Sequence, residues 1–125
     1  MVSTSASLLL IAFGGSLGAL SRYAVIHGFR IWFPQVTFPW HTLLVNIVGS
    51  FLLGIIIVLA KGKPIHFFLG IGFCGSLTTF STFAVEISER VLAHNYLSAG
   101  TYLCTSCLLC VAVAVAGMVF AQSLR

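Results

Sequence analysis

The sequence predicts an all-α integral membrane protein with four transmembrane helices, the third of them broken near its middle. Of the 125 residues, 59% are hydrophobic and only 6% are charged, whereas soluble domains carry about 25% charged residues. Uncharged stretches recur at the length of about 20 residues that a helix needs to cross a bilayer. Four such helices with short loops occupy residues 1–125 as a single membrane domain.

The first helix is expected over residues 5–27. Gly14 and Gly18 lie one turn apart, which allows a neighbouring helix to approach closely. Arg22 lies near the end of this helix, and two interpretations stay open for it. It either snorkels to the surface and caps the helix, or it places a cation at the vestibule of a pore. Residues 28–40 are expected to form an aromatic loop at the membrane interface.

The second helix is expected over residues 40–60. Asn46, Ser50 and Gly54 are four residues apart, so they share one face. A side-chain amide inside an apolar span is costly to expose to lipid and therefore points inward. Asn46 either bonds another helix or lines the path of a solute, and the second interpretation is favoured by the polar stretch of the third helix.

The third segment, residues 65–94, is too long for one simple span. Its centre, residues 70–83, reads GIGFCGSLTTFSTF. We expect the helix to break near residues 72–78, because a broken helix is tolerated at membrane depth where the freed backbone lines a cavity or binds an ion. After the break, Phe80 and Phe83 share a helical face among hydroxyl groups.

The fourth helix is expected over residues 97–122. Tyr102, Ser106 and Cys110 recur every four residues and form a narrow semi-polar stripe, which serves either packing or a polar track. The spacing of Cys104, Cys107 and Cys110 resembles a metal motif. No histidine accompanies it, so thiols that pack between helices are the favoured interpretation.

The charges predict how the chain inserts. Four spans place three cations on one side, Lys61, Lys63 and Arg125, and three on the other, Arg22, Arg30 and Arg90. This balance gives no orientation by the positive-inside rule. We therefore expect insertion in both orientations and an antiparallel homodimer whose two-fold axis lies in the membrane plane. Glu86 is spaced to pair with Arg90, or alternatively borders a vestibule.

Several classes of protein are disfavoured. The net charge of +4 is scattered near helix ends, so it indicates topology and not binding to nucleic acid. Matches to a hydrolase elbow and to a dinucleotide fingerprint lack the strands and acids that these motifs require, so no enzyme is expected. A small dual-topology cation or drug exporter needs a membrane-embedded glutamate in its first helix, and this chain has none there.

The polar groups of the apolar spans suit a small anion. They are hydrogen-bond donors, and the edges of phenylalanine rings add partial positive charge. Weak dipoles replace the water around an anion without a fixed cation that would trap it. From the residues alone we expect a channel or carrier for a small anion, lined by Asn46, Phe80, Ser81, Thr82, Phe83, Tyr102 and Ser106.

Three stretches of the sequence, residues 14–23, 42–51 and 72–83, resemble the Fluc/CrcB fluoride channels. The similarity covers the first three helices in order. It implies an antiparallel, dual-topology homodimer in membrane lipid, with two pores that export fluoride passively across the cytoplasmic (inner) membrane. A membrane assembly subunit that does not conduct ions is the alternative from another class.

The resemblance also implies roles for single residues. Phe80 and Phe83 fall on paired pore phenylalanines and Asn46 on a pore asparagine. Tyr102 and Ser106 fall on the polar track of the fourth helix, where Cys110 replaces the commoner hydroxyl. The resemblance further implies a structural Na⁺ at the dimer centre, bound by the main-chain carbonyls of Gly75 and Thr78.

Overall fold

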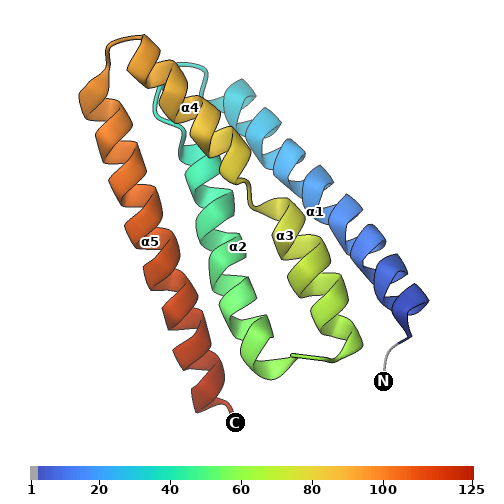
Figure 1. The fold of residues 1–125 in the computed structure, drawn as a ribbon. Helices are drawn as coiled ribbons and strands as arrows, with labels where there is room; N and C mark the ends of the chain where they lie inside the picture. Colours follow the sequence, from blue (N-terminus) through green and yellow to red (C-terminus); the bar gives the residue numbers. More distant parts are fainter. Residues whose placement is uncertain (1–2) are drawn as a thin grey trace.

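The computed structural model describes residues 3–125, and its elements are all helical (Figure 1). Four segments are long and apolar enough to cross a membrane, which confirms the predicted fold class. The third segment consists of three helical pieces. In chain order the elements are α1 (Thr4–Trp32), α2 (Trp40–Leu59), η1 (His66–Cys74), α3 (Gly75–Leu77), α4 (Phe80–Leu92) and α5 (Tyr96–Ser123).

The first helix is longer than expected. It was predicted to end at residue 27, but α1 continues to Trp32, so the loop before α2 is shorter than the predicted 28–40. The added turn is held by aromatic contacts, because the Phe29 ring lies 4.9 Å from that of Phe33 and 5.7 Å from that of His41 in α2. The other spans begin and end within two residues of the predicted bounds.

The helices are arranged around α2 (Figure 1). It packs against α5 along one side and against η1 and α3 along the other, while α1 covers η1 and α3. After the break, α4 crosses toward α5. The turn between α2 and η1 lies at the same end of the molecule as both termini, and the other two connections lie at the opposite end.

Glycines allow the closest helix contacts. A Cβ atom added to Gly14 or Gly18 would collide with the backbone carbonyl of Phe68 or Phe73 in the third segment. This confirms that these two glycines admit a neighbouring helix. The contact between α2 and α5 is closed in the same way by Gly54 and Gly117.

The third segment breaks at two threonines. Thr78 has a ψ of 155° and Thr79 a φ of −150°, so both are extended. The break therefore lies at the C-terminal edge of the predicted range, 72–78. The Thr79 hydroxyl accepts a hydrogen bond from the Thr82 amide at 3.2 Å and so caps the start of α4.

The glycines before the break serve close packing. Gly70 and Gly72 lie in η1, a π-helix that the sequence did not predict, where Gly72 meets the backbone of α1 at Ile11 and Gly14. A π-helix carries one more residue per hydrogen-bonded turn than an α-helix. The glycine cluster thus marks the contact with α1, and the threonine pair marks the break.

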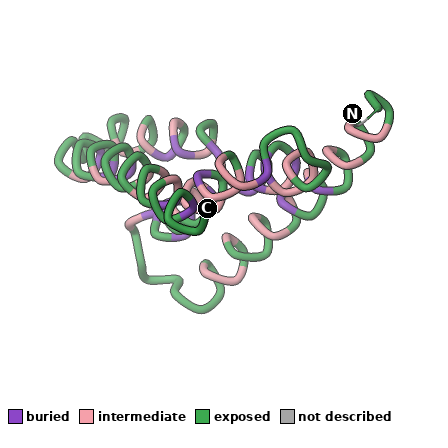
Figure 2. The backbone as a smooth tube through the Cα atoms, turned by 90° about the horizontal axis from the view of Figure 1, so that it is seen from below, coloured by how far each residue is buried: buried purple, intermediate pink, exposed green. Residues whose placement is uncertain are grey.

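Little of the chain is buried within one copy, as the predominance of exposed backbone in Figure 2 shows. The core is the place where α2, α4 and α5 meet, and it consists of Leu43, Phe83 and Tyr102. The exposed side chains of the four spans are mostly apolar, as a lipid environment requires.

Candidate functional site

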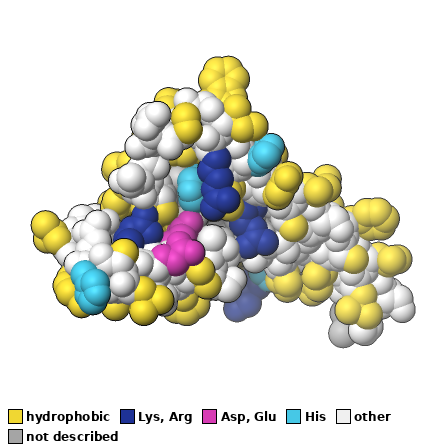
Figure 3. All heavy atoms as spheres, turned by 90° about the horizontal axis from the view of Figure 1, so that it is seen from above, with side chains coloured by type: hydrophobic (Ala, Val, Ile, Leu, Met, Phe, Trp, Pro, Cys, Tyr) yellow, Lys and Arg dark blue, Asp and Glu magenta, His cyan; other side chains and the backbone are white. Residues whose placement is uncertain are grey.

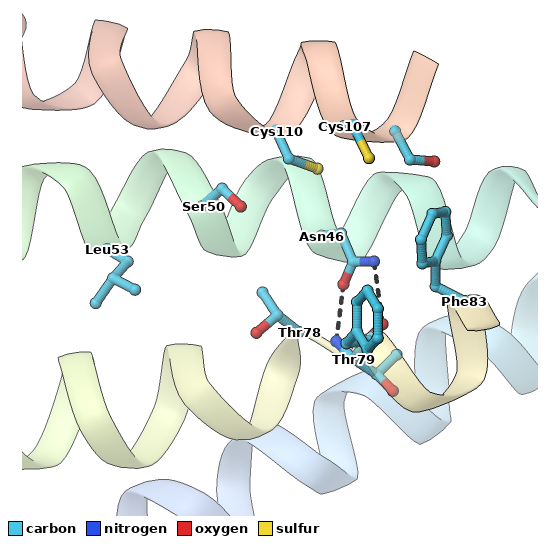
Figure 4. Close-up of a pocket in the computed structure, with 10 residues that line it drawn as sticks. Asn46, Ser50, Leu53, Thr78, Thr79, Phe83, Cys107 and Cys110 are labelled. Atoms are coloured by element: carbon cyan, nitrogen blue, oxygen red, sulfur yellow. Dashed lines mark hydrogen bonds between the residues drawn. The ribbon is translucent and has the colours of Figure 1, made fainter. Parts of the chain in front are cut away.

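A groove lies between α2, the break, the start of α4, and α5 (Figure 4). Its volume is about 270 Å³. Polar groups from separate helices converge on it at mid-depth, together with two phenylalanines and two thiols. The lining residues are Asn46, Ser50, Leu53, Thr78, Thr79, Phe80, Phe83, Ser106, Cys107 and Cys110.

Asn46 joins the groove to the break. Its Oδ1 accepts a hydrogen bond from the Thr79 amide at 2.8 Å, and its Nδ2 donates to the Thr79 carbonyl at 3.3 Å (Figure 4). The predicted bond to another segment is thus confirmed, whereas a role along the path of a solute stays a prediction for this groove-lining residue. The paired bonds satisfy backbone groups that an interrupted helix leaves without partners.

The two phenylalanines lie side by side but in different surroundings. Their ring centroids are 5.7 Å apart. Phe83 is 5% exposed and packs edge-on against Tyr102 at 5.0 Å, whereas Phe80 is 79% exposed. Phe83 is thus fixed by the core, and Phe80 stands at the open side of the groove.

Tyr102 points away from the groove. The residue is fully buried, and its hydroxyl donates to Glu86 Oε2 at 2.7 Å. Glu86 Oε1 accepts a second hydrogen bond, from the Thr42 hydroxyl at 2.8 Å. The tyrosine that was predicted to line the pore therefore presents its phenyl ring to Phe83 and its hydroxyl to Glu86.

Glu86 does not form the predicted ion pair with Arg90. The Arg90 guanidinium donates instead to the backbone carbonyls of Glu86 and Thr37, both at 2.7 Å. Glu86 is buried, with 8% of the residue exposed, and its Oε1 lies 3.8 Å from His41 Nδ1. An i, i+4 spacing permits a pair, but the hydroxyls on α2 and α5 satisfy this carboxylate.

A second cavity, of about 290 Å³, lies between α1 and α4. It is lined by Arg30, Ser81, Thr82, Val85, Glu86 and Glu89. The view from above shows acidic side chains next to basic ones at this end of the molecule (Figure 3). Ser81 and Thr82 thus line this second cavity and not the groove, and the vestibule role of Glu86 stays a prediction.

Thr79 lines the groove and forms hydrogen bonds with two residues of the second cavity. Its hydroxyl lies 3.2 Å from the Ser81 hydroxyl and donates to the Thr82 hydroxyl at 3.1 Å. Its backbone is held by Asn46 on the groove side. Arg22 lines neither cavity. Because α1 continues to Trp32, Arg22 does not lie near the end of this helix as predicted, and its vestibule role stays a prediction.

Ser106 offers an unused polar group. Its side-chain oxygen is buried and forms no hydrogen bond within residues 3–125, although it lines the groove. A buried hydroxyl without a partner is costly. It is therefore a natural contact for a ligand that enters the groove.

The break also leaves carbonyl oxygens free. No backbone N–H of the described residues donates to the carbonyl of Gly75 or Thr78, and Gly75 is exposed. The last carbonyls of a helix carry partial negative charge, so these two oxygens fit a hard cation. No group of three or more His, Cys, Asp or Glu side chains in the described part of the chain could hold a metal ion.

The sequence did not reveal the cluster of Glu86, Thr42, His41 and Tyr102. Its one signal was an acid within an otherwise apolar span. Such an acid requires partners, but the rotation of three helices relative to one another determines which ones it finds. The exposed phenylalanine, the asparagine and the serine of the groove, in contrast, were all indicated by the sequence.

Comparison with known proteins places the chain in a family. Residues 9–118 match the family described as CrcB-like protein, Camphor Resistance (CrcB). The chain is 38% identical to a protein of Leptospira interrogans serovar copenhageni over 122 residues, 91% of this chain and 93% of that one. It is 40% identical to a protein of Hahella chejuensis over 119 residues, 89% and 91% of the two chains.

A third relative, from Listeria innocua, is 45% identical over 91 residues, 72% of this chain and 75% of that one. The Leptospira and Hahella proteins are named fluoride-specific ion channel FluC, and the Listeria protein fluoride-specific ion channel FluC 1. The family match covers most of each of the four membrane segments and every residue of the groove. The chain therefore belongs to the CrcB-like family.

Proposed function

We propose that this protein is a fluoride-selective ion channel that lets fluoride leave the cell passively across the cytoplasmic membrane. The observation that carries the proposal is the groove, which combines the Asn46 amide, the unpartnered Ser106 hydroxyl and the rings of Phe80 and Phe83. Relatives named as fluoride-specific channels support the choice of ion.

The groove is suited to a small, strongly hydrated anion. No lysine or arginine lines it, so nothing in it would hold an anion as a permanent ion pair. Its hydroxyls, amide and ring edges replace water by several weak dipoles.

The functional unit in this proposal is an antiparallel homodimer in lipid, with copies inserted in both orientations. Phe80 is 79% exposed beside the groove, so one copy leaves the path without a wall on that side. A second copy in the opposite orientation supplies this wall, and the two-fold axis produces two equivalent pores.

We further propose that Na⁺ lies at the centre of this dimer. The free carbonyls of Gly75 and Thr78 would hold it, because hard cations prefer oxygen ligands and the C-terminal end of a helix is negative. Bound Na⁺ would stabilise the dimer and take no part in moving the anion. Replacing Na⁺ by a large organic cation on both sides should reduce the dimer fraction; an unchanged fraction would refute the site.

Fluoride efflux from proteoliposomes, read with a fluoride electrode, tests the function. Wild-type protein should release fluoride rapidly under a potassium gradient with valinomycin, and chloride far more slowly. Equal rates for the two ions would refute the selectivity. No flux from a folded dimer would instead favour the assembly subunit, and cation exchange driven by a pH gradient would favour the exporter.

A further inference from the structure

The wall of the groove on α5 contains two thiols that the function above does not use. Cys107 and Cys110 both line it, and Figure 4 shows both sulfur atoms on the side of α5 that faces Ser50 and Asn46. Cys107 is exposed within one copy and Cys110 is half-buried, and all four cysteines are free. We infer that Cys107 and Cys110 form a two-thiolate site for soft metal cations such as Hg²⁺, and that a bound cation closes the anion path.

The spacing of the two cysteines fits a single two-coordinate ion. Side chains three apart on a helix are neighbours, with about 5–6 Å between Cβ atoms, and soft thiolates select soft cations. A linear S–metal–S unit needs only two ligands, so no third protein group is required.

The chemistry also suits the depth of the groove. Two S–H bonds break, two S–Hg bonds form, and two protons leave to water, so that Hg²⁺ and two thiols give a neutral bis-thiolate. A neutral product avoids the cost of a fixed charge inside the membrane. The bulk of the metal next to Ser106 and Asn46, which line the same groove, would then exclude an anion.

The other two cysteines provide the controls. Cys104 has the same spacing to Cys107 as Cys110 has, and it is exposed, but it does not line the groove. Cys74 is buried in η1 against α1 and α2. If spacing alone determined the site, Cys104 and Cys107 would bind as well as the proposed pair.

The experiment measures Hg²⁺ retained per chain by purified dimer after gel filtration in excess cysteine. A free monothiol removes mercury from single cysteines, whereas a preorganised pair holds it through its high effective concentration. Wild type and C104S should retain mercury, while C107S and C110S should each retain about tenfold less. Equal retention by all variants, or a loss in C104S alone, would overturn the site.

Fluoride efflux tests whether the site lies in the path, a step that rests on the proposed channel function. Hg²⁺ should stop efflux in wild type and C104S but not in C107S/C110S, and a dithiol should restore it. Retained mercury with undiminished efflux would overturn the claim that the metal closes the path. Absence of any fluoride efflux before mercury is added would refute the channel function itself, while retention still decides the metal site.

Discussion

Asn46 holds the broken segment at the groove. Its amide satisfies both the N–H and the C=O of Thr79, and Thr79 in turn caps α4 through Thr82. One side chain therefore fixes the height of the break and the start of the helix that carries both phenylalanines. Because both hydrogen bonds go to the backbone of Thr79, the same side chain supports the break and lines the groove.

Replacing Asn46 by leucine should lower both stability and fluoride efflux. Each backbone group of Thr79 that loses its partner costs about 1–3 kcal/mol, and the break is then free to move out of the groove. Thermal unfolding in detergent and efflux from liposomes measure the two effects. Ser50→Ala is the matched control, because Ser50 lines the same groove one turn away, and its unfolding temperature should be close to wild type.

The two phenylalanines should respond differently to truncation. Phe83→Ala removes a ring from the core with Leu43 and Tyr102, which costs about 3–5 kcal/mol. Phe80→Ala removes a ring that is 79% exposed in one copy, so the fold of the copy should survive while efflux falls. A Phe80→Ala variant with wild-type efflux would move the ion path away from this side of the groove.

The lining of the groove was largely predictable, and its hydrogen bonds were not. Asn46, Phe80, Phe83 and Ser106 were indicated because polar and aromatic groups recur in uncharged spans. Tyr102 lies four residues before Ser106 on the same helix, but it does not line the groove, and its hydroxyl bonds Glu86. The spacing of residues predicts which of them share a face of a helix. The contacts that each side chain makes also depend on its length and on the neighbouring helices.

The helices themselves are held together by contacts between backbones. Gly14 and Gly18 bring α1 against η1, and Gly54 and Gly117 bring α2 against α5. In lipid, close packing of this kind drives helix association, since the hydrophobic effect does not distinguish helix from lipid. The glycine pair in α1 predicted a close neighbour, but not that the neighbour would be η1, because π-helices are rare.

Replacing either of two glycines of α1 by alanine should have different effects on the free energy of unfolding. In Gly14→Ala the new Cβ meets the Phe68 carbonyl, and overpacking of this kind costs about 1–3 kcal/mol. Gly28 lies in the same helix with open space around its Cα, so Gly28→Ala should be neutral or stabilising by up to about 1 kcal/mol. Unfolding of the two variants in one detergent compares them, and equal shifts would contradict the role of α1 packing.

The sequence predicted the break in the third segment only to within several residues, and the structure shows which residues are extended. The break was expected at residues 72–78 because of a cluster of three glycines, yet Gly72 packs against α1. The extended residues are Thr78 and Thr79, because Thr79 caps the new helix and bonds Asn46. The position of the break thus depends on the Thr79 cap and on its partner Asn46 in another helix. A sequence can indicate a capping residue, but not which residue of another helix will bond it.

The cations of the molecule lie toward both of its ends, although Arg22 lies inside α1, well before the end of that helix at Trp32. Lys61 and Lys63 lie in the turn after α2, at the end of both termini, and Arg30 and Arg90 lie toward the other end. An even balance gives the insertion machinery no preferred orientation. The proposed antiparallel dimer requires this balance, because both orientations must be present in one membrane.

Three lysines inserted beside Lys61 should therefore fix the orientation and remove the dimer. Gly62 must be kept, since its φ of 76° favours glycine. A reporter fused to the C-terminus should show both orientations in wild type and one in the variant, whose fluoride efflux should fall because no opposite copy is available.

Co-expression with a second variant carrying three lysines in the loop after α1 should restore efflux, since the two locked copies are complementary. A wild-type chain with a single orientation would refute the antiparallel dimer, whereas efflux from the first variant alone would show that parallel copies suffice.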